Sequence, residues 1–420
     1  MASGRRDARE NPPPAPSVFG SKVEGTADAG HGDCAQRGLA TRARIAGIVE
    51  GDVEGIVEDF PAAGPRVFVA AETRMTAARP DQGIPAIVTA GDTRAAKAVY
   101  GESKVFLPVA GRAIVAHVVL ALQDVPEISE VWVVGDRERL GEVFSAADLR
   151  QAIRKPLYLV PQGRNLLENA WETYRCVISR DPERGRDPRP DEMDLQVLYI
   201  SGDLPFATAL EISAFAKAGL AHEDCDYAFG YVREEALEGF LPSSPGESGI
   251  EVAYFNLRDG RVRQNNLHFA RPARIANRER INDMYEHRHQ RQFWHMGALA
   301  WKVFFSRGGG PIIVFLYMCM HLAGLADRWK LRGLADRLRG WVTLRRNEEV
   351  IGRLLAARFC FLATEAGGCA IDVDTEQEYD AVKLHFEDWT RAQRARAQAL
   401  YAPQSQAGRP SAAGGNAADG

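Results

Sequence analysis

The chain has 420 residues, of which 45% are hydrophobic and 26% are charged, and its formal net charge is −4. This composition is typical of a globular protein, and the length is enough for one large α/β domain or two smaller ones. The slightly acidic charge balance argues against general binding of nucleic acids.

The first part of the chain shows no regular spacing of apolar residues. Residues 1–83 are rich in Gly, Ala, Pro, Arg and Asp without apolar periodicity, so we expect a mostly disordered extension, in which 66–71 favours a short strand. Met75 is a candidate for the natural start. No charged-then-apolar signal pattern is present, which predicts a cytoplasmic protein. The six cysteines show neither C-x-x-C pairs nor metal-ligand spacing, so we expect free thiols and no disulfide.

A loop suited to phosphate follows the first predicted core strand. The apolar run 84–88 predicts a buried parallel strand, and open α/β sheets bind ligands at the carboxyl ends of such strands. Small residues there let backbone N–H groups approach an anion, and basic residues can neutralise a triphosphate. An apolar helix (113–122) and a second buried strand (131–135) come next. The loop residues in question are Ala90, Gly91, Asp92, Thr93, Arg94, Lys97 and Lys104.

Two later segments place carboxylates at the ends of apolar runs. Residues 195–218 predict a strand that ends at Asp203 and a helix that begins at Thr208. Residues 370–382 contain Asp372 and Asp374. Carboxylates in these places can hold Mg²⁺ against phosphates, although each also fits a helix cap or a turn, and Thr375 with Glu378 would form a capping box.

Together the three segments resemble the MobA-like NTP transferases, which are nucleotidyltransferases with a glycosyltransferase-A type fold. Their opening pattern is a strand, A-x-G-x-x-x-R, a variable loop, and then K-x-L-x-x-V-x-G-x-P-x-I. The Asp203 and Asp374 segments follow in the order that the family requires. The residues that stand at the positions of this opening pattern, or within one position of them, are Ala90, Gly91, Arg94, Lys104, Phe106, Val109, Gly111 and Ile114.

The resemblance implies a fold and a set of roles. The fold is α/β, with a Rossmann-like mixed, mostly parallel sheet and flanking helices of the nucleotide-diphospho-sugar transferase type. The loop from Ala90 to Arg94 would cradle phosphates, and Lys104 would stabilise charge on the α-phosphoryl group. Mg²⁺ would be held by Asp203 and Asp374, with Asp372 as the second choice. The further residues implied are Gln162, Gly163 and Asn169 for the nucleotide base, and Asn265 and Asn266 for the acceptor, the last two being equally compatible with surface turns.

The sequence departs from the family pattern in two ways. Asp92 puts a negative charge inside the phosphate loop, where it would repel phosphate unless it turns away or meets the metal. Ala113 and Glu376 stand where proline is common in the family. Of the two departures, the charge at Asp92 bears on catalysis.

A large insertion separates the two carboxylate segments. Its first part, 227–270, predicts strands with a hairpin turn at Asp259-Gly260. The rest, 271–361, predicts helices and carries 17 Lys and Arg against 7 Asp and Glu, which implies an anionic partner. Three histidines, His287, His289 and His295, do not share a helical face, and we interpret them as part of a solvated basic helix rather than as metal ligands.

The insertion also contains an apolar segment. Residues 308–326 lack formal charges but begin with glycines and a proline, and the following segment to residue 346 has an amphipathic, interfacial pattern. Three interpretations compete: a helical subdomain packed on its own core or on a second subunit, peripheral contact with an anionic membrane or lipid-linked substrate through 308–346, and a transmembrane helix.

The sequence thus predicts four regions: the extension (1–83), a nucleotidyltransferase domain (84–270 and 362–398), the basic helical insertion (271–361) and a disordered tail (399–420). The predicted activity is Mg²⁺-dependent transfer of an NMP group from an NTP to a sugar, polyol or lipid-like phosphate, with release of pyrophosphate. The alternatives are a glycosyltransferase that uses an NDP-sugar and a non-catalytic, nucleotide-binding, membrane-associated adaptor of the same fold. In each case we expect the protein in the cytoplasm or at the inner face of the membrane.

Overall fold

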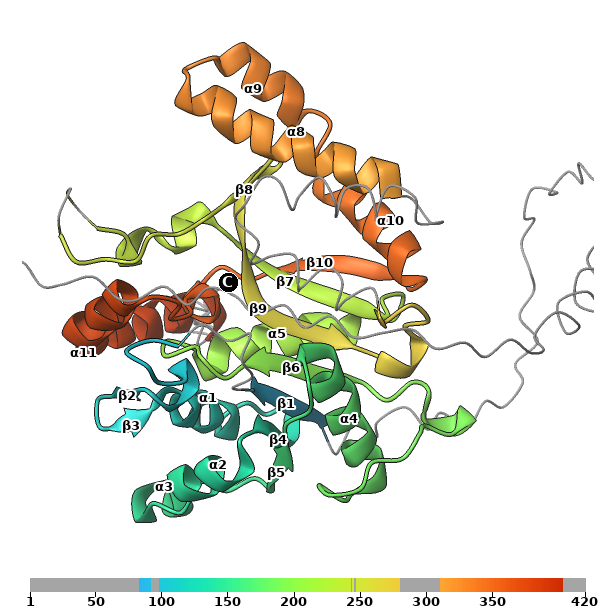
Figure 1. Cartoon of the computed structure of the whole chain (residues 1–420), viewed down its shortest axis with the longest axis vertical. Coiled ribbons are helices and arrows are strands. Elements are labelled where there is room, and N and C mark those ends of the chain that lie inside the picture. The colour runs from blue at the N-terminus through green and yellow to red at the C-terminus, as the bar shows by residue number, and fades with distance from the viewer. Residues whose placement is uncertain (1–82, 92–97, 243, 245–246, 280–309, 403–420) are drawn as a thin grey trace, which may run out of the picture. The chain divides into compact units, whose positions relative to one another are not determined.

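The computed structural model describes residues 83–91, 98–242, 244, 247–279 and 310–402 (Figure 1). Several predictions fall outside these residues: the extension 1–82, most of the tail, the loop residues Asp92, Thr93, Arg94 and Lys97, and the three histidines at 287, 289 and 295. The remaining predictions can be followed in the structure.

The described residues form an eight-stranded mixed sheet. All neighbouring pairs are parallel except those that involve β9, which runs antiparallel to its neighbours β6, β7 and β8. The carboxyl ends of the parallel strands therefore lie along one edge. In spatial order the strands are β10 (Phe359–Ala363), β7 (Tyr227–Arg233), β9 (Gly260–Ala270), β6 (Val197–Ser201), β1 (Ile84–Ala90), β4 (Ile128–Gly135) and β5 (Leu157–Pro161), with β8 (Phe255–Leu257) paired to β9. The small hairpin of β2 (Pro108–Val109) and β3 (Arg112–Ala113) stands apart.

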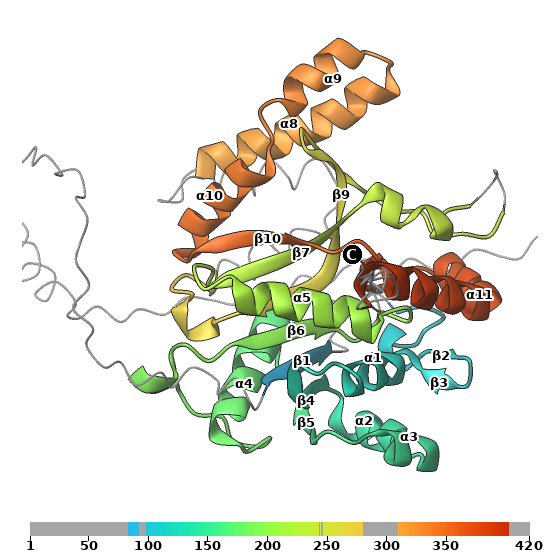
Figure 2. The ribbon, with the colours of Figure 1, turned by 180° about the vertical axis from the view of Figure 1, so that it is seen from behind.

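Alternating apolar residues of the central strands build a core on each face of the sheet. In β1, Ala86 and Val88 pack with apolar residues of α1 and α5, whereas Ile87 packs on the other face with Tyr174 of α4. Figures 1 and 2, which view the molecule from opposite sides, show α4 in front of the sheet in one view and α5 in front of it in the other. Outside the insertion, the described α-helices are α1 (Ile114–Gln123), α2 (Arg137–Phe144), α3 (Ala147–Ala152), α4 (Leu166–Ser179), α5 (Ala209–Ala221) and α11 (Glu376–Tyr401). The predicted α/β architecture is confirmed.

Short polar side chains begin the helices that follow the site segments. Thr208 accepts a hydrogen bond from the backbone N–H of Glu211 at the start of α5, and Thr375 accepts one from Glu378 at the start of α11. In α11 the Glu378 carboxylate in turn accepts from the N–H of Asp374 (2.7 Å), one residue earlier than the predicted capping box.

The insertion adds three described helices: α8 (Gly310–Arg328), α9 (Arg332–Arg339) and α10 (Leu344–Leu355). Both views show α8 and α9 side by side at one end of the sheet, beyond β8 (Figures 1 and 2). Strand β10 (Phe359–Ala363) begins within the last three residues of the segment 271–361. Within the part of the chain that the structure describes, no helix combines the length and the hydrophobicity needed to cross a membrane.

One sequence prediction is corrected by the fold. Cys225 and Cys360 form a disulfide, with Cα atoms 6.2 Å apart. Cys225 lies just before β7 and Cys360 lies within β10, and these two strands are neighbours although 135 residues separate the cysteines in the sequence. The expectation of free thiols therefore fails at this pair, because it considered only local spacing. Among the described residues, the free cysteines are the buried Cys176, Cys319 and Cys369.

Candidate active site

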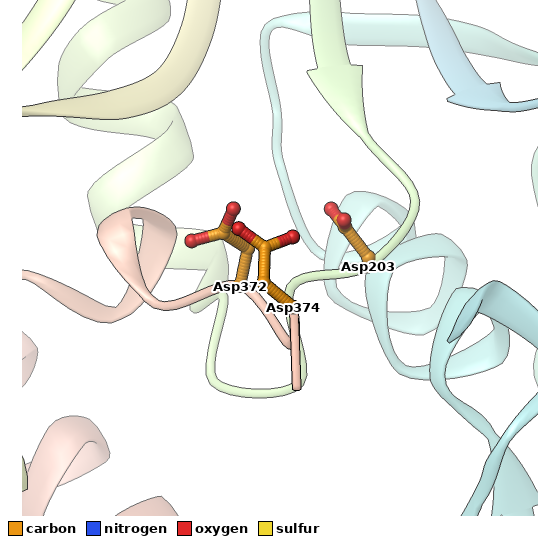
Figure 3. A group of neighbouring side chains, drawn as sticks. All are labelled: Asp203, Asp372 and Asp374. Carbon is orange, nitrogen blue, oxygen red and sulfur yellow. The ribbon is translucent and has the colours of Figure 1, made fainter. Parts of the chain in front are cut away.

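Three aspartates meet at the edge of the sheet where the parallel strands end. Oxygen atoms of Asp203, Asp372 and Asp374 all lie within 4.8 Å of one another. Figure 3 shows the side chains pointing into the same space, Asp203 from the turn after β6 and the other two from the segment before α11. Asp203 and Asp372 are almost completely buried, whereas Asp374 is partly exposed. The structure thus brings together all three residues predicted to hold a metal.

Local sequence explains how each carboxylate reaches this place. The backbone N–H of Gly202 donates to the Thr89 carbonyl (2.9 Å), and a Cβ on Gly202 would lie only 3.2 Å from that of Ala90. Glycine therefore lets the turn that carries Asp203 pass close to the end of β1.

On the other side, Ile371 and Val373 are fully buried in an apolar cluster with residues of α11. The carboxylates that alternate with them, Asp372 and Asp374, consequently turn the opposite way, toward Asp203.

Lys104 reaches into the same group from the loop after β1. Its Nζ lies 2.7 Å from Asp203 Oδ2 and 2.5 Å from Asp374 Oδ1. Burial disfavours the charged ammonium, but the surrounding carboxylates outweigh this effect and hold the pKa of Lys104 well above its usual value. Lys104 is therefore a permanent cation near neutral pH and is unsuited to act as a general base.

Arg263, on β9, is a charged residue of the site that no sequence pattern indicated. Its Nη2 lies 2.6 Å from Asp372 Oδ1, and its Nε donates to the Ala370 carbonyl (2.9 Å). Burial and the neighbouring Asp203 raise the pKa of Asp372, while Arg263 and Lys104 act against that rise. Arg263 thus fixes the segment that carries Asp372 and compensates part of its charge. In the sequence it is one basic residue among several in a strand, a pattern that equally fits a solvated surface.

The donor set fits Mg²⁺. Three carboxylates on separate backbone positions supply the hard oxygen ligands that this ion prefers. The Lys104 ammonium shows that the group already accepts a cation, since it contacts two of the three carboxylates.

The predicted nucleotide-binding residues that the structure describes also come together. A Cβ on Gly91 would lie 2.8 Å from Asn169 Nδ2 and 3.6 Å from Gln162 Oε1. Asn169, buried in α4, accepts a hydrogen bond from the backbone N–H of Gly163 (2.6 Å). The end of β1, the residues that follow β5 and the first turn of α4 therefore lie together. Ala90 itself is fully buried at the end of β1.

The two asparagines predicted to bind the acceptor differ in their placement. Asn265 is completely buried, and its Nδ2 donates to Thr364 Oγ1 (2.9 Å) while its Oδ1 accepts from the N–H of Leu267. Thr364 in turn donates to the buried Glu211 (2.7 Å). This geometry gives Asn265 a structural role and does not favour contact with an acceptor.

Asn266 is half-buried and has a φ of 55°, in the left-handed region. It lies where the register between β7 and β9 shifts, and the next residue, Leu267, pairs with Ile200 near the end of β6. Asn266 therefore stands close to the turn that carries Asp203, which suits the predicted role.

The chain matches no protein-family model and no curated protein sequence. Among solved structures it is similar to a hypothetical transferase from Thermus thermophilus, with 21% identity, a TM-score of 0.44, and coverage of 70% of this chain and 99% of that one.

Two further structures show similarities of the same kind. One is 4-diphosphocytidyl-2C-methyl-D-erythritol synthase from Anaerococcus prevotii (12% identity, TM-score 0.38, 73% of this chain and 99% of that one). The other is CMP:2-keto-3-deoxy-manno-octonic acid synthetase in complex with CTP (12% identity, TM-score 0.36, 73% and 99%).

Proposed function

We propose that this chain is a Mg²⁺-dependent nucleotidyltransferase that moves an NMP group from an NTP to a phosphorylated acceptor, such as a sugar, polyol or lipid-like phosphate. One observation supports this proposal above the others: Asp203, Asp372, Asp374 and Lys104 converge at the carboxyl end of β1 and β6. The resemblance of the sequence to MobA-like NTP transferases agrees with this arrangement.

In the proposed reaction, an oxygen of the acceptor phosphate attacks the α-phosphorus in line. A new P–O bond forms, the bond to the bridging oxygen breaks, and pyrophosphate leaves with the electron pair. Such chemistry depends on positioning and charge neutralisation more than on a protein nucleophile. When bound, Mg²⁺ neutralises phosphate charge and helps to orient the reacting groups.

The residues of the site have separate roles in this reaction. Asp203, Asp372 and Asp374 would hold the metal, with Arg263 fixing the second of them. The Lys104 ammonium, charged at neutral pH, would stabilise the negative charge that develops on the α-phosphoryl oxygens.

The nucleotide itself would lie along the edge formed by β1 and β5. Gly91 would let backbone N–H groups approach the phosphates, and Gln162 and Asn169 would contact the base. The loop residues Asp92, Thr93 and Arg94 would complete the phosphate site. Asn266 would face the acceptor from β9.

The test is pyrophosphate release from each of the four common NTPs with Mg²⁺ and a panel of phosphorylated acceptors. We expect release that needs one NTP and one acceptor together and that falls at least 100-fold in Asp203→Asn. Asp388→Asn, at an exposed position of α11, is the matched control and should keep full activity. Nucleotide binding without release in any combination would contradict the proposal and favour an adaptor.

A second candidate rests on one observation. Asp372-Val373-Asp374 has the D-x-D form that many glycosyltransferases use, and both of its carboxylates face the site. If an NDP-sugar were the donor, the reaction would release NDP instead of pyrophosphate. Its place after the last strand of the sheet, instead of at the end of a mid-chain strand, makes nucleotidyl transfer the preferred assignment.

A further inference from the structure

Helix α8 carries two apolar stripes, and only one of them is used by the fold. Leu316 and Cys319 are buried in a cluster with Leu257 of β8, Val262 of β9 and Val350 of α10. This stripe fixes the helix to the sheet and to α10. The sequence had left open whether the apolar segment packs on the protein, and the structure shows that one side of it does.

The second stripe of α8 is exposed. Its members recur at intervals of three and four residues, which places them on one side of the helix. Each of these large side chains has between 37% and 66% of its surface accessible. Such a contiguous apolar row is unusual on a protein surface unless it meets a partner. The row consists of Phe315, Met318, Leu322, Leu325 and Trp329.

The exposed row continues beyond α8. The ring of Trp341 contacts that of Phe315, with centroids 6.0 Å apart, and is itself half-exposed. Leu331 and Leu334, at the start of α9, are also half-exposed. We call these eight residues, from Phe315 to Trp341, the apolar surface of the α8–α9 hairpin. A tryptophan at 329 and another at 341 give it aromatic residues whose rings suit the boundary between water and lipid.

Positive charge accompanies the apolar surface. Residues 327–346 contain seven Lys and Arg against two Asp, a net charge of +5. Both of these aspartates, Asp327 and Asp336, pair with the same arginine, Arg339. Three of the other basic side chains, Lys330, Arg332 and Arg337, are exposed. The partner that fits is therefore apolar in its interior and negatively charged at its surface.

We propose that the α8–α9 hairpin docks on the surface of an anionic lipid bilayer, with the apolar surface inserted among the lipids and the basic residues facing the headgroups. Apolar insertion and attraction of Lys and Arg to acidic lipids are the two contributions to interfacial binding. A surface of this kind lies in the interface of one leaflet. A second copy of this chain could also bury the apolar row. In such a dimer, however, the basic residues of one copy would face the same basic residues of the other and repel them.

The helix that carries the docking surface is connected to the candidate active site through its buried stripe. Val262 packs in the same cluster as Leu316, and its neighbour Arg263 holds Asp372. The proposal does not depend on the proposed reaction, because binding to lipid requires neither nucleotide nor acceptor.

The test is co-sedimentation of the full chain with vesicles of phosphatidylcholine alone and with vesicles that contain phosphatidylglycerol. We expect binding to the anionic vesicles that is at least tenfold stronger and that weakens as salt is raised. The double variant Leu322→Glu/Leu325→Glu should lose at least tenfold in affinity, and Arg332→Glu/Arg337→Glu should do the same. Leu384→Glu, at a leucine of α11 that is even more exposed (69%), is the control for an added surface charge and should bind as the wild type does.

A second measurement, tryptophan fluorescence of the wild-type chain, tests lipid contact without relying on the charged variants, which could fail to fold. Lipids with brominated acyl chains should quench the fluorescence of Trp329, so that quenching is smaller in Trp329→Phe than in the wild type. Absence of binding to anionic vesicles would overturn the proposal. So would a dimer in solution, measured by sedimentation equilibrium, that Leu322→Glu/Leu325→Glu converts to a monomer, because the occupant of the apolar surface would then be a second copy.

Discussion

Replacing Lys104 by methionine should destabilise the protein, because three carboxylates would then face one another without their ammonium. Removal of one partner from a buried ion pair costs about 3–5 kcal/mol. One partner here, Asp203, is almost fully buried, but Asp374 has 43% of its side chain exposed, and water would screen its charge. We therefore expect a loss of about 2–4 kcal/mol, which for a domain of this size lowers Tm by about 4–8 °C.

The assay is thermal unfolding at pH 7.5 in EDTA, with Lys383→Met as control. Lys383 forms an exposed pair with Asp380 (3.0 Å), and its loss should change Tm by less than about 2 °C. Lys104 acts against the raised pKa of Asp372, so in Lys104→Met that pKa rises further, and the loss of stability should become smaller as pH falls from 8 to 5. Mg²⁺ should restore the variant more than it stabilises the wild type. A Tm drop no larger than that of the control would refute the reasoning.

Three further predictions concern single residues. Gly91→Ala places a Cβ 2.8 Å from the Asn169 amide, so nucleotide affinity should fall about fivefold or more by calorimetry while Tm changes little; unchanged affinity would remove this edge from the nucleotide site. Glu211→Gln replaces an oxygen that accepts from the N–H groups of Gly367 or Cys369 and should cost about 1–3 kcal/mol in urea unfolding. Because burial raises the pKa of Glu211, the folded wild type gains stability as pH falls toward that pKa, so its advantage over Glu211→Gln should widen from pH 7 to pH 5; a constant difference would contradict the assignment. Asn266→Gly relieves a positive φ and should leave stability equal or higher by up to about 1 kcal/mol, whereas the KM for the acceptor, and not that for the NTP, should rise.

Much of the fold was accessible from local sequence patterns. The apolar run before Gly91 forms β1, and Thr208 caps α5 as predicted. The hairpin turn predicted at Asp259-Gly260 forms one residue earlier, with Arg258 and Asp259 between β8 and β9. These features depend on alternation, turn chemistry and capping, which act over a few residues. The convergence of Asp203 with Asp372 and Asp374 was expected from motif order, although they are about 170 positions apart in the sequence.

The remaining features depend on tertiary contacts that a single sequence does not show. Arg263 meets Asp372 only because β9 enters the sheet between β6 and β7. Asn265 resembles a surface turn residue, yet the shifted register of β9 buries it against Thr364. The disulfide of Cys225 likewise depends on strand pairing. In α8, periodicity showed that the segment is apolar but not which stripe packs on the protein.

In the proposed function, the three aspartates hold the metal of a nucleotidyl transfer site. An anomalous difference map from crystals grown with Mn²⁺ and each NTP in turn tests this role. We expect a manganese peak bound by Asp203 and by Asp372 or Asp374, with the nucleotide phosphates beside Gly91 and Lys104. Manganese or nucleotide bound elsewhere, with these carboxylates still paired to Lys104, would contradict this role.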